Sequence, residues 1–334
     1  MTETPTILKV SDLRTHFFTE SGVARAVDGV SFSIPAGRTL GLVGESGCGK
    51  SVTALSLMQL VPHPPGRIVA GQIELAGTNL LECSESQMRR VRGGRMAMIF
   101  QEPMTSLNPV FTVGEQITEA IRLHQPGPKQ SVREKAIRAL DEVGIPAPEH
   151  RINDYPHQLS GGMRQRAMIA MALACKPELL IADEPTTALD VTIQAQILQV
   201  LKVLQDKEAL TMLLITHDLG IVASAAQQVA VMYAGRIVEY APVGPLYARP
   251  RHPYTQALFR SLPRLSQGDR AAGRKRLEVI PGSVPNPLVF PDGCRFHPRC
   301  TRAKLICKQQ CPPLEGVDGD EAHLAACWFR ETNE

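Results

Sequence analysis

No stretch of this sequence approaches the roughly 18 uncharged apolar residues that a membrane-spanning helix needs. The densest apolar segments, Met168–Cys175 and Leu210–Ile215, are long enough only for buried elements. The start, Met1–Val10, lacks the basic residues and apolar run of a secretory signal. We therefore expect a soluble, cytoplasmic chain that reaches a membrane only through a partner.

An excess of charge of one sign is lacking as well. Lys and Arg total 36 against 33 Asp and Glu, so the formal net charge is only +3. This balance argues against a nucleic-acid binder that relies on a broad cationic surface. No internal repeat is visible, so we expect no tandem pair of similar domains. The 334 residues, 43% of them apolar, suffice for one large α/β domain and a smaller part.

Apolar runs alternate with helical patterns along most of the chain. Val30, Phe32 and Ile34 alternate with serines, as in a half-buried strand. Continuous apolar runs, typical of strands covered on both faces, occur at Arg38–Val43, Leu179–Ala182 and Met212–Ile215. Helical spacing occurs at Ser51–Leu60, Ser131–Val143 and Gly161–Ala174. This order predicts an α/β fold with a parallel sheet built from right-handed crossovers.

A phosphate-binding loop follows the first apolar run. It matches the pattern G-x-x-x-x-G-K-[ST] in full, over Gly44, Glu45, Ser46, Gly47, Cys48, Gly49, Lys50 and Ser51. The loop lies between a predicted strand and a predicted helix, where backbone N–H groups and the helix N-terminus attract phosphate. We expect Lys50 to reach the β- and γ-phosphates and Ser51 to bind Mg²⁺, with Val52 next to them. Cys48 is expected to be inert.

Two acids end the second apolar run. Asp183 is placed to hold Mg²⁺, and Glu184 could act as the general base that polarises the attacking water. His217 ends the next run and could contact the γ-phosphate, although a lone histidine is more often structural. Gln101 follows Met96–Phe100 and, on its own spacing, could be an ordinary surface amide.

A second anion-binding helix start lies at Ser160, Gly161 and Gly162. The serine is a helix cap, and the glycines open the helix. One ATP does not need two such helix starts, so they are expected to serve different ATP molecules, shared between two subunits.

Together these motifs resemble the ABC-type ATPases over residues 1–262. The resemblance implies a RecA-like core, an antiparallel β subdomain and a helical subdomain at about 102–176. It makes Gly44–Ser51 the Walker A loop, Leu159–Met163 the signature and Glu184 the catalytic carboxylate after Asp183 of Walker B. It further identifies a Q-loop glutamine that also binds Mg²⁺, a D-loop aspartate and a switch histidine: Gln101, Asp190 and His217.

The same resemblance implies two further features. Phe17 would stack on adenine, with Phe18 a weaker alternative. Two subunits would pair head to tail, with Ser160 of one facing the Walker A loop of the other. Met163 departs from the glutamine of the commonest signature, while the serine and both glycines remain.

Finer features resemble the dipeptide/oligopeptide importer branch of this family. They are Gly44–Gly47, Gln101–Pro109, Tyr155–Met163, Arg251–Thr255 and the cysteine-rich tail. The resemblance implies a peripheral ATPase at the cytoplasmic face of the inner membrane. Its partners would be a second ATPase or another copy, two integral permeases that dock near Gln101–Val113, and an extracytoplasmic peptide-binding protein. Import of nickel, opines or antimicrobial peptides stays open as an alternative, and a soluble, non-transporting ABC ATPase is the competing class.

The end of the chain has its own composition. Residues 263–280 are expected to form a linker, and residues 281–334 a small, irregular extension. Several thiols in a short Pro-rich segment suggest a metal staple, but the absence of a C-x-x-C pair fits a common zinc ribbon poorly. An iron–sulfur cluster, zinc and free or disulfide-linked thiols stay open on spacing alone. The resemblance implies a 4Fe-4S cluster on Cys294, Cys300, Cys307 and Cys327, leaving Cys311 over.

Overall fold

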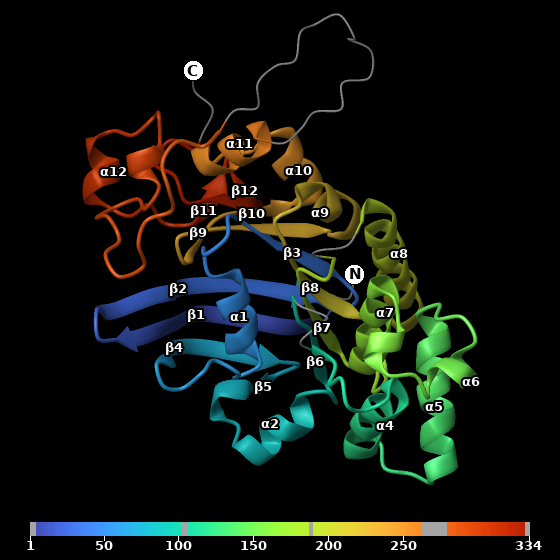
Figure 1. Cartoon of the computed structure of the whole chain (residues 1–334). Helices are drawn as coiled ribbons and strands as arrows, with labels where there is room; N and C mark the ends of the chain where they lie inside the picture. The colour runs from blue at the N-terminus through green and yellow to red at the C-terminus, as the bar shows by residue number, and fades with distance from the viewer. Residues whose placement is uncertain (1–4, 102–105, 187–189, 262–278, 331–334) are drawn as a thin grey trace, which may run out of the picture.

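The computed structural model describes residues 5–101, 106–186, 190–261 and 279–330. Its centre is an eight-stranded sheet in the order β11-β12-β10-β9-β3-β8-β7-β6 (Figure 1). The five strands from β9 to β6 are parallel. Their bounds are Gln228–Tyr233 (β9), Thr39–Val43 (β3), Thr211–Thr216 (β8), Leu179–Asp183 (β7) and Met96–Ile99 (β6). The predicted parallel α/β sheet is therefore confirmed, because β3, β7 and β8 are the three continuous apolar runs.

A second, antiparallel sheet lies beside the first. Its order is β2-β1-β4-β5, with bounds Gly22–Pro35, Thr6–Thr19, Gly66–Leu75 and Thr78–Asn79. Helix α1 (Lys50–Leu57) packs between the two sheets, where Leu57 and Ala54 are fully buried in a shared apolar core. A short helix, α2 (Glu85–Val91), closes this side of the molecule.

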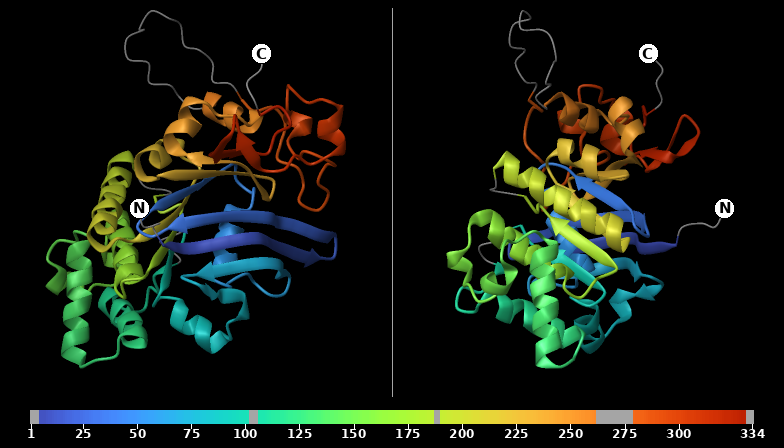
Figure 2. Two further views of the ribbon diagram at one scale, coloured as in Figure 1. Left: turned by 180° about the vertical axis from the view of Figure 1, so that it is seen from behind. Right: turned by 90° about the vertical axis from the view of Figure 1, so that its right-hand side faces the viewer.

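Four helices form a separate lobe at the far edge of the main sheet, drawn in green in Figures 1 and 2. They are α4 (Val113–His124), α5 (Lys129–Glu142), α6 (Pro148–Arg151) and α7 (Gly161–Leu173). Their apolar faces share one core with β6, β7 and α8 (Val191–Glu208). This lobe presents the start of α7 to the same side of the molecule as the end of β7.

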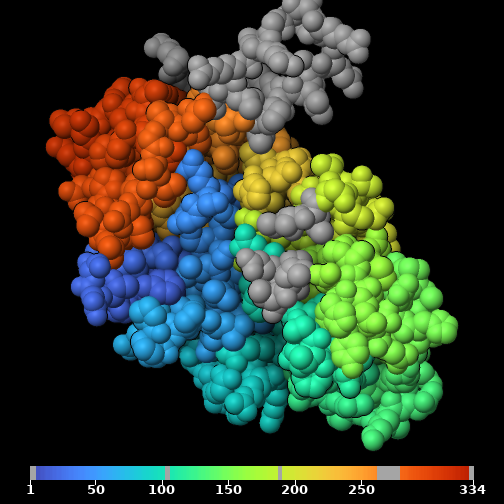
Figure 3. All heavy atoms as spheres, in the orientation of Figure 1, coloured from blue at the N-terminus to red at the C-terminus, as the bar shows by residue number. Residues whose placement is uncertain are grey.

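The cysteine-rich extension joins the main sheet. Strand β10 (Arg236–Pro242) is antiparallel to β9, and β12 (Asp320–Ala325) pairs with β10 through Glu239 and Ala325. The outermost strand is β11 (Glu315–Val317), and the extension also holds α12 (Leu305–Gln309). It packs against α9 (Leu219–Ala225), α10 (Val243–Ala248) and α11 (Pro253–Arg260). Figure 3 shows it in orange and red, directly against the blue strands.

One predicted helix end differs from the structure, and two predicted segments are not fully described by it. Helix α1 ends at Leu57 and not at Leu60, because the chain turns into the left-handed region at Gln59 (φ 50°). Most of the expected linker, residues 262–278, and part of the Q-loop, residues 102–105, lie outside the described residues. Within the described ranges, no helix is long and apolar enough to cross a bilayer.

Candidate nucleotide-binding site

The Walker A loop connects β3 to α1 at the carboxyl end of the parallel sheet. Two of its glycines cannot be replaced. A Cβ on Gly44 would lie 2.2 Å from the Met232 carbonyl oxygen, and one on Gly49 would lie 2.3 Å from that of Ala26. The buried Lys50 folds back along the loop, where its Nζ donates to the carbonyls of Gly44 (2.8 Å) and Glu45 (3.1 Å). The loop is therefore a preformed concave turn at a helix N-terminus, as anion binding requires.

Asp183 ends β7 and is buried. Burial raises its pKa, while a hydrogen bond from Ser51 lowers it. Among the described residues its Oδ1 has no hydrogen-bond partner. A buried carboxylate oxygen beside a serine hydroxyl is the kind of oxygen pair that Mg²⁺ prefers, so Ser51 and Asp183 fit the predicted metal.

The Glu184 carboxylate contacts two of the other predicted residues, Gln101 and His217. It sits in the left-handed region (φ 47°), held by a hydrogen bond from its N–H to the Ile215 carbonyl. The Nε2 of Gln101 donates to Glu184 Oε2 at 3.1 Å, and Nδ1 of His217 lies 3.2 Å from Oε1. Residues from the ends of β6, β7 and β8 thus meet at one carboxylate. Neither Gln101 nor His217 could be assigned a role from its own spacing.

The signature lies at the exposed N-terminus of α7. Ser160 caps the helix by accepting the N–H of Met163, so methionine here leaves the cap intact. Gly161 faces open space, whereas a Cβ on Gly162 would lie 2.9 Å from the Ile193 side chain. Asp190 is the N-cap of α8 and accepts the N–H of Ile193 at 2.9 Å. The start of α8, which Asp190 caps, is therefore packed against the signature helix. Residues 187–189, which precede Asp190 in the D-loop, lie outside the described residues.

The two candidate adenine-stacking rings lie on β1. Phe17 is opposite Ala24 of β2 and Gly66 of β4, and a Cβ on Gly66 would lie 2.9 Å from its ring. Phe18 is 50% exposed. Phe17 therefore packs against β4, whereas Phe18 is the more exposed ring; the stacking role of Phe17 stays a prediction.

The structure adds two residues that sequence reasoning missed. The hydroxyl of Tyr254 accepts the Glu45 N–H at 2.9 Å, and the guanidinium of Arg299 binds the Glu45 carboxylate. The second contact joins the extension to the Walker A loop, because Arg299 belongs to the extension. The partners lie 209 and 254 residues apart in sequence, so spacing gives no signal of either contact.

The Arg251–Thr255 motif explains how Tyr254 is placed. The buried carboxylate of Glu239 on β10 accepts the N–H groups of Arg251 (2.7 Å) and His252 (2.9 Å). It also bonds His323 of β12 at 2.7 Å. These contacts fix the start of α11 and aim the Tyr254 ring at the Walker A loop.

Four cysteines of the extension line one cavity, namely Cys294, Cys300, Cys307 and Cys327. Burial, helped by the neighbouring thiols, raises the pKa of Cys294 to about 12. The cavity measures about 20 Å³, room for little more than one water. Among the described residues, no three His, Cys, Asp or Glu side chains are placed to hold a metal ion.

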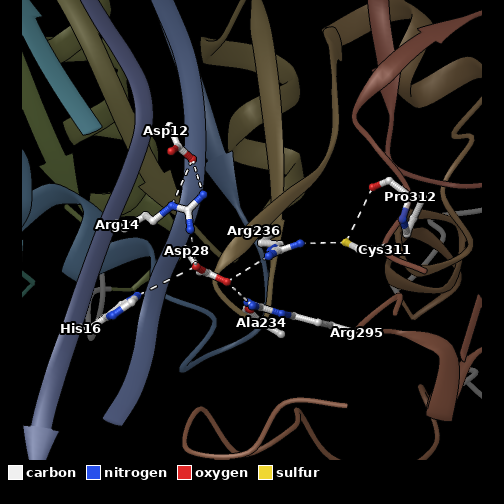
Figure 4. A network of polar contacts seen from close by, with 9 residues as sticks. All are labelled: Asp12, Arg14, His16, Asp28, Ala234, Arg236, Arg295, Cys311 and Pro312. Atoms are coloured by element: carbon white, nitrogen blue, oxygen red, sulfur yellow. Dashed lines mark hydrogen bonds and ion pairs between the residues drawn. The ribbon is translucent and has the colours of Figure 1, made fainter. Parts of the chain in front are cut away.

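Cys311 does not line this cavity; it belongs to a polar network between the extension and the β subdomain (Figure 4). Its Sγ accepts a hydrogen bond from Arg236 at 2.7 Å. Arg236 also binds Asp28 (3.1 Å), and Arg295 of the extension binds the same carboxylate. Burial alone would raise the pKa of Asp28, but Arg295 and Arg236 hold it below its usual value. This ion pair anchors the extension to β2.

Comparison with known proteins gives the family. The "ABC transporter" family model matches residues 27–187, and the "Oligopeptide/dipeptide transporter, C-terminal region" model matches residues 238–307. A dimeric ATP-binding cassette in a post-hydrolysis state with ADP and Pi is similar in fold, with a TM-score of 0.64 and 24% identity over 71% of this chain and 98% of that one.

Two curated relatives match over nearly the whole chain. A probable peptide ABC transporter ATP-binding protein of Sinorhizobium fredii is 56% identical, covering 96% of this chain and 94% of the relative. The dipeptide transport ATP-binding protein DppD of Escherichia coli is 52% identical, covering 92% of each. Because relatives at 56% and 52% identity match nearly its whole length, this chain belongs to the ABC transporter ATP-binding proteins of the oligopeptide/dipeptide type.

Proposed function

We propose that this chain is the ATP-hydrolysing subunit of an importer that takes up dipeptides or short oligopeptides through partner permeases. The observation that carries the proposal is the convergence of Gln101 and His217 on Glu184, at the edge of the sheet where the Walker A loop also lies. The peptide cargo is supported by the relatives at 56% and 52% identity, which are a probable peptide and a dipeptide transport ATP-binding protein.

The hydrolytic step assigns a task to each residue. Mg²⁺ bound by Ser51 and Asp183, with Gln101 as a further ligand, would neutralise phosphate charge together with Lys50. The remaining Walker A residues, Gly44–Gly49 and Val52, would surround the phosphates. Glu184 orients and deprotonates the attacking water, while His217 and Gln101 hold the carboxylate and report on the γ-phosphate.

A complete site needs two ATPase subunits. Ser160, Gly161 and Gly162 lie at an exposed helix N-terminus, a suitable surface for the ATP of a partner subunit. The partner would be a second ATPase or another copy, arranged head to tail. Closure around two ATP molecules would move the permeases, and hydrolysis would allow the dimer to reopen.

The permease contact is expected at an apolar groove between the helical lobe and β6. The groove measures about 610 Å³ and is lined by residues that include Leu60, Phe100, Ser106 and Met171. Leu60 and Phe100 are 38% and 40% exposed. A groove of this kind suits a short amphipathic helix of a permease, and would hold the chain peripherally at the cytoplasmic face of the inner membrane.

For the extension we propose a 4Fe-4S cluster on Cys294, Cys300, Cys307 and Cys327. Its support is the donor set: four thiols around one cavity, with Cys311 turned to Arg236 instead. The lack of a C-x-x-C pair fits a common zinc ribbon poorly, which favours the cluster over zinc. When bound, the cluster would staple the extension and could accept an electron.

Uptake by the whole transporter tests the cargo. Labelled dipeptide should enter cells through it and be competed by unlabelled dipeptides and tripeptides, but not by Ni²⁺ or opines. If only Ni²⁺ competed, the proposed cargo would be nickel and not a peptide. Neighbouring genes for two permeases and an extracytoplasmic binding protein would support transport; their absence would favour a soluble ABC ATPase.

A further inference from the structure

Glu45 occupies a position of the phosphate-loop pattern where any residue is allowed, yet its side chain is fixed. Nη1 of Arg299 donates to Glu45 Oε2 at 2.7 Å, and Nη2 donates to Oε1 at 3.0 Å. This is a two-pronged guanidinium–carboxylate pair, the strongest common form of such a contact. Glu45 therefore contacts the extension through its side chain and the phosphate-binding Lys50 through its backbone.

Arg299 is itself immobilised. Its side chain is 5% exposed, its Nε donates to the Pro281 carbonyl at 2.8 Å, and its Nη1 also reaches the Tyr233 hydroxyl at 3.3 Å. The hydrogen bonds to Glu45 raise the pKa of Arg299, so the guanidinium stays charged. A side chain held at each of its nitrogens fixes its partner more firmly than an exposed ion pair would.

The backbone of Glu45 in turn holds the phosphate-binding lysine. Its carbonyl accepts the Lys50 Nζ at 3.1 Å, and its N–H donates to Tyr254 at 2.9 Å. Tyr254 lies against Tyr233, with ring centroids 4.6 Å apart. Displacement of Glu45 would therefore disturb the loop at both of its backbone contacts.

Arg299 also ties this contact to the cysteine-lined cavity. It ends a single turn, His297–Arg299, that separates Cys294 from Cys300. That turn is closed by the N–H of His297 on the Cys294 carbonyl (2.9 Å) and by the N–H of Cys300 on the His297 carbonyl (3.3 Å). A change in the distance between Cys294 and Cys300 would therefore move Arg299, which binds Glu45.

We propose that Arg299 is a positioning residue of the ATP site: it holds the Walker A loop through Glu45 and makes ATP affinity depend on the fold of the cysteine-rich extension. The proposal rests on ATP binding by this loop. It is independent of the cargo and of what the cysteines bind.

The test is a double-mutant cycle in the full chain, read as the Kd for MgATP. Arg299→Ala and Glu45→Ala should each raise Kd about tenfold, and the double variant should be no worse than either single one. Arg299→Lys keeps the charge but cannot make both hydrogen bonds to the carboxylate, so its Kd should lie between those of the wild type and Arg299→Ala. In the assembled transporter the KM for ATP should rise while kcat stays close to wild type.

Arg330→Ala is the matched control. Arg330 belongs to the same extension, pairs with Glu315 at 2.6 Å and also bonds the Gly316 and Cys327 carbonyls, so none of these contacts involves Glu45. As long as the variant stays folded, the loss of Arg330 should leave Kd unchanged. If Arg299→Ala does not fold, Glu45→Gln carries the test, because it lies outside the extension and keeps its shape. Wild-type affinity in Arg299→Ala, or losses that add in the double variant, would overturn the proposal. A lowered Tm with unchanged Kd would reduce Arg299 to a structural residue.

Discussion

Nδ1 of His217 lies 3.2 Å from Oε1 of Glu184. Gln101 binds the other oxygen of that carboxylate, so its orientation is set from two neighbouring strands before any substrate arrives. The carboxylate is largely shielded, whereas the histidine is 64% exposed. As the proposed general base, a carboxylate held in this way would need little reorganisation to accept a proton from water.

Glu184→Gln should bind ATP but turn it over at least about 100-fold more slowly, because the amide cannot accept the proton. The variant should accumulate as an ATP-bound closed dimer, measured by light scattering with and without ATP. His217→Ala should lower kcat more than it changes KM. His150→Ala, which removes an exposed histidine of α6, serves as the control and should leave turnover at the wild-type rate. Undiminished turnover in Glu184→Gln would remove this residue from the general-base role.

Phe17→Ala should weaken ATP binding about tenfold, since base–aromatic stacking is worth about 1–3 kcal/mol. Phe18→Ala is the matched change one residue along the same strand and should have a smaller effect. Titration with a fluorescent ATP analogue measures both. The reverse order of effects would assign the stacking role to Phe18.

Acid should destabilise the chain through His252. Burial lowers the pKa of this histidine to about 4, and Glu239 only partly opposes the shift; its ordinary value is 6.5. Its Nδ1 accepts the Tyr254 N–H, as a neutral ring does. Between pH 6.5 and pH 4 the unfolded chain takes up a proton that the folded chain refuses. Stability that is present above pH 6.5 is therefore lost as pH falls through about 4, by up to about 3 kcal/mol.

Urea unfolding at pH 7, 5.5 and 4.5 measures this loss. His252→Gln should flatten the dependence on pH, although it lowers stability throughout. His157→Gln removes an exposed histidine and should keep the wild-type slope. An equal slope in both variants would mean that other groups govern acid unfolding.

The iron content of cysteine variants should show which cysteines hold the proposed cluster. Purified without oxygen, the wild-type chain should be brown and contain iron and labile sulfide. Cys300→Ser should lose both, because it removes one of four ligands, whereas Cys311→Ser should keep them. A colourless, iron-free protein with a folded extension would exclude the cluster, and loss of iron in Cys311→Ser would refute the ligand set.

Local pattern was sufficient for the strands that carry the site. The strands β3, β7 and β8 are buried on both faces and therefore read as continuous apolar runs, which place the Walker A loop, Asp183 and His217 at their ends. The helices α5 and α7 were placed to within about two residues, inside the usual uncertainty of helix ends.

What escaped prediction depends on contacts between distant segments. The pairing of β12 with β10 and the grip of Arg299 on Glu45 join residues that share no periodic pattern. Neither end of such a contact is unusual alone: Arg299 reads as one more charged residue in an irregular tail. The role of Arg299 and that of Glu45, which stands at a variable position of the phosphate loop, become clear only from the contact between them.

The pairing of β12 with β10 has a practical meaning for anyone who wishes to shorten this chain. A cut placed between residues 262 and 280 would separate the ATPase part from the extension. It would remove β12 and so leave one edge of β10 without a paired strand. The bared backbone groups of that strand could then pair with another molecule. The cut would also remove the His323 side chain from the buried carboxylate of Glu239. The ATPase and its cysteine-rich extension should therefore be handled as a single folding unit.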